Sequence, residues 1–342
     1  MKTLRAVTVS AAVIFSLASC GGGGGSTSST SISPTTSSAS TSPNVALSTT
    51  NATQTVAGAF SGSGSLASVG SSVTALKATN GEQNNVLPLA ADAIIKTIEN
   101  QQITPAQTAM KFAAKSTSNV QQCGASGSTT ILVNMAGTTL QAGDSVSYVA
   151  NNCQNVAGGP VTNGTLAFTI SSLSPNNGSG FSAAVTFTAS NFTATNGSSY
   201  ASLNGALSMS AAVQETNYSP TSVQVSLTSP GLGLSSNTAA GNVNLLNLDY
   251  EYTNNLTNGV WSFLENAAIN NNGDVVAVQT NQNFSSAGCA YPSSGSAVVT
   301  GLNSSINVTA NNNGTATLVV NSNGASSTLT VPSSSVFGLV CI

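Results

Sequence analysis

The sequence contains no histidine. Histidine is the side chain most often used as a general base, and it activates the nucleophile in serine and cysteine hydrolases. Its absence excludes these catalytic sets and removes the commonest metal ligand. We therefore expect no metal ion and no other cofactor, and carboxylates are the main groups left for acid–base chemistry.

Charge is also scarce, since Asp, Glu, Lys and Arg make up 4% of the chain, against about 25% in ordinary soluble proteins. No lysine or arginine follows Lys115. The same part of the chain holds six carboxylates: Asp144, Glu215, Asp249, Glu251, Glu265 and Asp274. Such a surface cannot neutralise phosphates, which excludes nucleic acid as a partner and disfavours anionic lipid headgroups.

Aromatic residues are few, at 5%, but hydrophobic residues reach 40%. A chain of this composition can bury a core, so it is not disordered throughout. Serine, threonine, asparagine and glycine take the place of the missing charge. The surface should therefore be hydrated by hydroxyl and amide groups.

The first residues have the layout of a secretory signal peptide, predicted over 1–19. Lys2 and Arg5 precede an apolar stretch that is too short to span a bilayer, and the stretch ends in small residues. The following run, Leu17-Ala18-Ser19-Cys20, resembles the lipobox of bacterial lipoproteins. The resemblance implies cleavage before Cys20, attachment of diacylglycerol and a further acyl chain such as palmitate to Cys20, and a membrane as partner. Gly21 after the cysteine then points to the outer membrane, with the protein facing the periplasm or the cell surface.

The mature chain divides by composition into three parts. Residues 20–56 carry the lipidated cysteine and a Gly/Ser/Thr-rich run, which predicts a flexible tether. Residues 57–122 predict a small helical segment packed on the sheet, with helices near 88–101 and 104–115. Leu87, Ala91, Ile94, Ile95 and Ile98 would share one face of the first of these helices.

Residues 123–342 alternate between apolar and polar side chains, as in Leu166, Phe168 and Ile170. Asn-Gly pairs, which favour hairpin turns, separate the alternating runs; they lie at 163–164, 177–178, 196–197, 258–259, 272–273, 313–314 and 323–324. The pattern predicts a mainly β fold of roughly a dozen strands in a long antiparallel meander. One apolar face needs a cover, so the meander should be a curved sheet, sandwich or half-barrel covering the two helices.

Four cysteines remain besides Cys20, and an even number in an exported chain indicates disulfides. Strands predicted at 128–134 and 145–150 would form a hairpin whose turn lies midway between Cys123 and Cys153, so these two can be bridged. Cys289 and Cys341 then pair by elimination. Thiolate metal ligation lacks the usual close cysteine spacing.

Three motifs carry a second resemblance: Cys123-Gly-Ala-Ser-Gly-Ser128, Ala142-Gly-Asp-Ser-Val146 and Asn151-Asn-Cys153. With the lipobox, tether and short helices before them, they are similar to β-rich, uncharacterised lipoproteins of Gram-negative bacteria. This resemblance implies a compartment and a fold but no activity.

Three functions are compatible with these features. The one we favour is a non-enzymatic structural, adhesive or surface-interaction role, with a protein or glycan as partner. A carrier that holds a lipid or other hydrophobic ligand in a half-barrel is the alternative, and an unfilled apolar face would favour it. The third is a glycoside hydrolase using Asp249 and Glu251, which should share one strand face about 7 Å apart. Two solvated charges on a polar face are the simpler interpretation of that pair.

Overall fold

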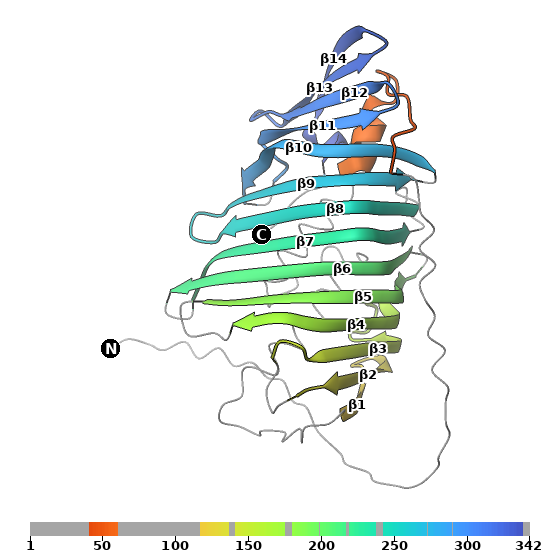
Figure 1. Ribbon diagram of the computed structural model, residues 1–342, viewed down its shortest axis with the longest axis vertical. Helices are drawn as coiled ribbons and strands as arrows, with labels where there is room; N and C mark the ends of the chain where they lie inside the picture. Colours follow the sequence, from red (N-terminus) through yellow and green to blue (C-terminus); the bar gives the residue numbers. More distant parts are fainter. Residues whose placement is uncertain are drawn as a thin grey trace. The chain divides into compact units, whose positions relative to one another are not determined.

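The computed structural model describes residues 41–60, 117–136, 141–174, 180–197, 199–216, 219–236, 242–271, 273–288 and 290–337. Fourteen strands form one antiparallel sheet in which each strand pairs with its sequence neighbours (Figure 1). The strands are β1 (Thr117–Gln122), β2 (Ser126–Asn134), β3 (Ser145–Gln154), β4 (Val161–Ser174), β5 (Gly180–Asn196), β6 (Ser199–Thr216), β7 (Ser219–Ser236), β8 (Asn242–Asn255), β9 (Val260–Asn271), β10 (Asp274–Ala287), β11 (Ser294–Gly301), β12 (Ser304–Ala310), β13 (Thr315–Ser322) and β14 (Ala325–Pro332). The predicted mainly β meander is confirmed; the predicted helices at 88–101 and 104–115 lie outside the described residues.

Period-two alternation gives the sheet an apolar inner face and a polar outer face. One inner row crosses five strands through Val133, Val146, Phe168, Phe187 and Leu207, and every member is buried. Burying a side chain of this size contributes about 1.5–3 kcal/mol. The inner face is therefore the main source of stability of the sheet.

Residues 44–60 cover the inner face along β10–β12, which corrects the prediction that the flexible tether reaches residue 56. Leu47 is 1% exposed, and its backbone N–H donates to the hydroxyl of Ser304. Residues 52–60 are helical, and Phe60 packs edge-on against Phe284 with ring centroids 5.3 Å apart. Ala52, Val56 and Ala59 are buried too. Helical spacing of these small and apolar residues orders the segment despite its Ser/Thr-rich surroundings.

Two of the Asn-Gly pairs lie inside strands rather than in turns. Asn163-Gly164, predicted as a turn, belongs to β4, and Asn204-Gly205 belongs to β6. In each case the asparagine faces a β-bulge in the preceding strand, where its side-chain oxygen accepts the N–H of Asn152 or of Asn191, both at 2.7 Å. Asn152 and Asn191 have positive φ values of 48° and 47°, a conformation that asparagine tolerates better than most residues.

The glycine of the first pair is required by close packing. Gly164 has a φ of 101°, and a Cβ at this position would collide with the backbone carbonyl of Asn191. Any larger residue would push β4 and β5 apart at the bulge. Of the other predicted turns, those at 196–197, 258–259, 313–314 and 323–324 do join consecutive strands.

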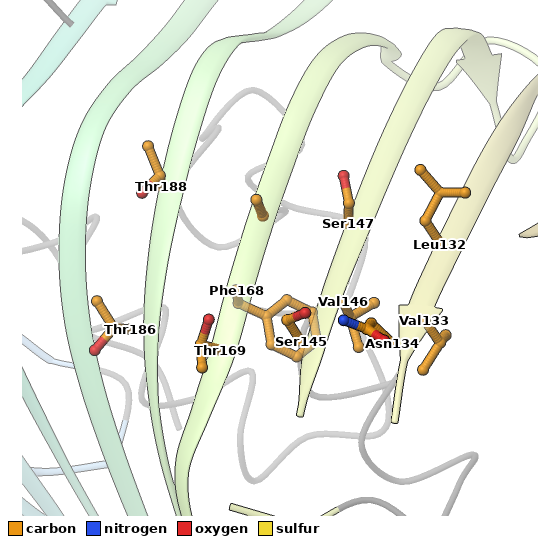
Figure 2. Close-up of a pocket in the computed structure, with 11 residues that line it drawn as sticks. Leu132, Val133, Asn134, Ser145, Val146, Ser147, Phe168, Thr169, Thr186 and Thr188 are labelled. Carbon is orange, nitrogen blue, oxygen red and sulfur yellow. The ribbon is translucent and has the colours of Figure 1, made fainter. Parts of the chain in front are cut away.

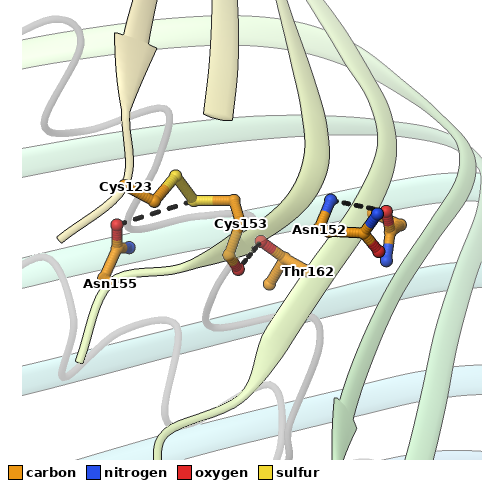
Figure 3. The surroundings of a disulfide bond; sticks show 6 residues. Cys123, Asn152, Cys153, Asn155 and Thr162 are labelled. Atoms are coloured by element: carbon orange, nitrogen blue, oxygen red, sulfur yellow. Dashed lines mark hydrogen bonds between the residues drawn. A yellow bond between two sulfur atoms is a disulfide. The ribbon is translucent and has the colours of Figure 1, made fainter. Parts of the chain in front are cut away.

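A disulfide joins Cys123 to Cys153, with Cα atoms 5.4 Å apart (Figure 3). Cys153 belongs to β3, and Cys123 lies just before β2, so the bridge ties the β1–β2 connection to the hairpin predicted from the sequence. The hydroxyl of Thr162 on β4 donates to the Cys153 carbonyl at 3.1 Å. Cys289 and Cys341, the other predicted pair, lie outside the described residues.

Candidate functional site

A continuous row of side chains crosses the outer face from β2 to β14. Residues in this central outer row are cross-strand partners, and each is exposed or partly exposed. It consists of Asn134, Ser145, Thr169, Thr186, Ser208, Thr228, Asp249, Asn266, Gln279, Val298, Asn307, Val319 and Thr328. Neighbouring strands lie about 4.8 Å apart, so the row presents regularly spaced hydroxyl and amide groups with one negative charge.

A hollow lies in the outer face over β2–β5 (Figure 2). It borders the first members of the central outer row, from Asn134 to Thr186, and the adjacent row of cross-strand partners Leu132, Ser147, Ala167 and Thr188. The hollow has a volume of about 310 Å³. Its polar lining comes from Asn134, Ser145, Ser147, Thr169, Thr186 and Thr188. Leu132, which is 39% exposed, and Val133, Val146, Ala167 and Phe168 supply the apolar remainder of the lining. The six polar side chains can donate and accept hydrogen bonds and the lining supplies no charge, which suits an uncharged partner with polar and apolar groups.

A second hollow, of about 410 Å³, lies where β12, β13 and β14 meet their hairpin turns. Its lining is again uncharged, with Asn303, Ser305, Asn321, Asn323 and Ser326 among its residues. The two hollows share one chemistry although they lie at opposite ends of the strand order. The outer face therefore offers repeated hydroxyl and amide contacts in place of a single reactive centre.

The inner face carries a different feature, a polar cluster inside the core. Tyr250, Tyr252 and Asn254 alternate along β8 and point inward, and they are 0%, 0% and 1% exposed. The Tyr250 hydroxyl lies buried without a hydrogen-bond partner, whereas the Tyr252 hydroxyl and the Asn254 side chain have each other as partners. Glu265 on β9, the cross-strand partner of Tyr250, is fully buried. We call Tyr250, Tyr252, Asn254 and Glu265 the inner polar cluster.

Apolar side chains stand on both sides of the inner polar cluster. On β7, Leu227, Val225 and Val223 are the cross-strand partners of Tyr250, Tyr252 and Asn254. On β9, Phe263 and Trp261 lie opposite Tyr252 and Asn254. The Trp261 indole N–H donates to the Gly288 carbonyl at 2.8 Å, so this donor is satisfied. The polar tips thus form a narrow strip between an aliphatic and an aromatic wall.

Burial dominates the ionisation of the two tyrosines. Burial raises the pKa of Tyr250 well above its usual range, and the nearby Glu265 and Tyr252 raise it further. Burial also raises the pKa of Tyr252, while its hydrogen bond with the Asn254 side chain acts in the opposite direction. Both hydroxyls therefore stay neutral far into the alkaline range.

Asp249 and Glu251 share the outer face of β8, as predicted. The Asp249 side chain is exposed, Glu251 is partly exposed, and the Asn266 side-chain N–H donates to Asp249 at 3.3 Å. Glu251 has Ser226 and Leu264 as cross-strand neighbours. Both carboxylates therefore lie on the solvated outer face, in line with the simpler interpretation of the pair.

Asp144 acts in a turn, as its position between strands suggests. Its two carboxylate oxygens accept the backbone N–H groups of Ala136 and Gln141, both at 2.9 Å. Among the described residues, no group of three or more His, Cys, Asp or Glu side chains could hold a metal ion. Cys20, the predicted lipidation site, lies outside them.

Sequence reasoning missed the inner polar cluster. Alternation along β9 (Trp261, Phe263, Glu265) could have placed Glu265 inward. The register that sets Glu265 opposite Tyr250 depends on a bulge between Leu246 and Asp249. No pattern in the sequence predicts this bulge.

No helix in the described ranges has the length and apolarity needed to cross a bilayer. Searches against protein-family models, curated proteins and solved structures find no match to this chain.

Proposed function

We propose that the protein is a lipid-anchored component of the bacterial cell envelope with a non-enzymatic, adhesive or structural role. Its β domain would contact an uncharged polar surface through the outer face. The observation that carries this proposal is the central outer row, ten of whose thirteen members are hydroxyl or amide side chains. The hollow over β2–β5 would be the place of closest contact.

The outer hydroxyls already pair with one another in places. Thr253 and Ser262 lie 2.7 Å apart, as do Ser285 and Ser294. Short side chains held by cross-strand neighbours lose little conformational freedom when a partner binds. Neutral polysaccharides, which present dense hydroxyl groups, fit such a face through hydrogen bonds rather than through charge.

A charge placed in the hollow should disrupt this contact. Thr169→Lys combined with Thr186→Lys would force two ammonium groups to lose water against an uncharged partner, which should lower binding at least about tenfold. Retention of the purified protein on a panel of insoluble neutral polysaccharides and on intact cells measures the effect. Thr257→Lys with Leu302→Lys, at exposed turn positions outside the central outer row and both hollows, is the control; equal retention of all three proteins would refute the role of the hollow.

Anchoring is tested separately at Cys20. Cys20→Ser removes the thiol that acylation needs, and several acyl chains at about 0.8 kcal/mol per buried methylene would otherwise hold the protein in the bilayer. We expect nearly all of the variant to move from the membrane fraction to the soluble fraction, measured by fractionation and immunoblotting. A variant that stays with the membrane would show that the lipobox interpretation is wrong.

A further inference from the structure

The free edge of β14 lacks the features that usually protect the outermost strand of a sheet. Natural proteins cover such an edge or interrupt it with lysine, proline, a bulge or a very short strand. β14 is eight residues long, pairs with β13 over its whole length without a bulge, and carries no charged residue. Its single proline, Pro332, is its last residue. The edge is therefore suited to pairing with another strand.

The described residues that follow β14 turn away from this edge. They form a short 3₁₀ helix, η1 (Ser333–Ser335), and then Val336 and Phe337, which are buried. The Phe337 ring packs against that of Phe284 on β10 with centroids 5.1 Å apart, so this segment lies on the inner face. Within the described ranges β13 is the only strand that pairs with β14, which ends the strand order (Figure 1).

The backbone groups at the edge can be assigned from the hydrogen-bond ladder. The Ser333 N–H donates to the Gly314 carbonyl, in continuation of the β13–β14 register. Bonded pairs alternate along an antiparallel ladder, so the peptide groups of Leu329 and of the residues two positions away face β13. Those of Thr328 and Thr330 face the free edge.

The inward side chains of β14 are incompletely covered. Leu329 and Val331 point to the inner face but are only partly buried, whereas their cross-strand partners on β13, Leu318 and Ala316, are 0% exposed. The core therefore ends at apolar side chains that are covered on one side. A second β14, antiparallel to the first, would bring Leu329 opposite the same residue of its partner without any like-charge repulsion.

The opposite edge, β1, is a poorer partner for β14. The inner-side residues of β1 are Thr117, Asn119 and Gln121, which are all polar. Beside β14 they would press amide groups against Leu329 and Val331, where the amides would lose water without gaining a hydrogen bond. Pairing of β14 with itself also has two-fold symmetry, so it stops at two molecules, whereas β14–β1 pairing would continue into an open chain of molecules.

We propose that β14 is a dimerisation edge, at which two copies of this chain join their sheets by antiparallel β14–β14 pairing. The pairing would be centred on Leu329, with Thr328 of each copy hydrogen-bonded through its peptide group to Thr330 of the other. This inference goes beyond contact through the outer face. The dimer would present two hollows over β2–β5 on the same side of one continuous sheet.

Sedimentation velocity of the full chain carrying Cys20→Ser, which avoids detergent, measures the assembly. One pair of strands makes an interface below the standard size, so we expect a reversible dimer with a dissociation constant of roughly 1–100 μM. Thr328→Pro removes an N–H that faces the free edge, a position at which an edge strand tolerates proline. The dissociation constant should rise at least about tenfold. Val120→Lys, at a β1 side chain that is 59% exposed, is the control and should leave it unchanged.

Cysteine substitution tests the register. Directly opposite residues of antiparallel strands lie about 4.5–5.5 Å apart at Cα, within the range of a disulfide. Leu329→Cys should therefore give a covalent dimer on mild oxidation, detected by non-reducing electrophoresis. Thr330→Cys should give little, because it would lie opposite Thr328 of the partner.

Four results would overturn the proposal. A monomer at every concentration would show that the edge does not pair with a second copy, and an unchanged dissociation constant in folded Thr328→Pro would place the contact elsewhere. Loss of the dimer in Val120→Lys would indicate pairing with β1. Failure of Leu329→Cys to form a covalent dimer would refute the pairing however Thr328→Pro folds. Retention through the hollow over β2–β5 is measured with different variants, so it is tested independently.

Discussion

Replacing Phe263 with alanine should lower the free energy of unfolding by about 3–5 kcal/mol, the usual cost of removing a large core aromatic side chain. Phe263 is 2% exposed and lies at the centre of an aromatic run. Its ring centroid is 5.3 Å from that of Phe284, 6.0 Å from Tyr250 and 6.2 Å from Trp261. Alanine would leave a cavity bordered by three rings on three strands. Urea denaturation followed by far-ultraviolet circular dichroism measures the loss.

The neighbouring residue provides a matched control. Leu264 follows Phe263 on β9 but points to the outer face and is partly exposed. Leu264→Ala should cost less than about 1.5 kcal/mol, because little apolar area leaves a buried site. Equal losses for the two variants would mean that β9 does not have one core side and one solvent side.

The second large effect concerns alkaline pH. The tyrosine pKa is about 10 in an unfolded chain, and burial holds both Tyr250 and Tyr252 above that value in the folded protein. Between pH 10 and the higher pKa values of the folded protein, the unfolded chain releases tyrosine protons that the folded chain retains. A rise in pH through this range therefore favours the unfolded state. The contribution of Tyr250 and Tyr252 to the free energy of unfolding is fully present below pH 10. Above pH 10 it should fall by up to about 2.7 kcal/mol per pH unit for the pair. Urea denaturation at several pH values measures this slope.

The double variant Tyr250→Phe/Tyr252→Phe isolates the cause. It should lack this part of the alkaline slope, whereas Tyr200→Phe, at a side chain that is 38% exposed, should keep it. At pH 7 the double variant should lie within about 1 kcal/mol of the parent, since removal of the unpartnered Tyr250 hydroxyl offsets the loss of the hydrogen bond between Tyr252 and Asn254. An unchanged slope in the double variant would show that neither tyrosine stays protonated in the folded state.

The fold could be predicted from the sequence because its strands are amphipathic and their pairing is local. Alternation at Leu166, Phe168 and Ile170 identifies β4 and its inner face, and all three are buried. The hairpin predicted from the strand patterns at 128–134 and 145–150 made a bridge between Cys123 and Cys153 possible, and these two are bridged. Such patterns reflect period-two geometry directly, so they survive into the structure.

The bulges and the covering segment could not be predicted in the same way. Asn-Gly favours a hairpin turn and a bulge for the same reason, since both need positive φ. At Asn163-Gly164 the bulge is distinguished from a hairpin turn by the hydrogen bond from the Asn152 N–H on β3 to the Asn163 side chain on β4. Residues 44–60 look like tether by composition, and their burial depends on contacts such as Leu47 with Ser304, more than 250 positions away.

The two faces of the sheet differ in predictability as well. The hydroxyl and amide character of the outer face follows from composition, since few other polar residues are present. The inner polar cluster depends on which residues of β8 and β9 stand opposite each other, and a shift of one position would turn Glu265 outward. Register of this kind is set by bulges and neighbouring strands, so it required the structure.

The strictly sequential strand order has a further consequence. Because each strand bonds only to the one before and the one after it, the sheet behaves as a nearly one-dimensional chain of nearest-neighbour couplings, like a repeat protein. Opening should begin at the free edges, β1 and β14, and progress inward one strand at a time, so amide hydrogen exchange should be slowest near the middle. The inner polar cluster, on β8 and β9, occupies this slowest-exchanging region. Folding of the chain can likewise proceed by adding hairpins in order, without long-range strand pairing.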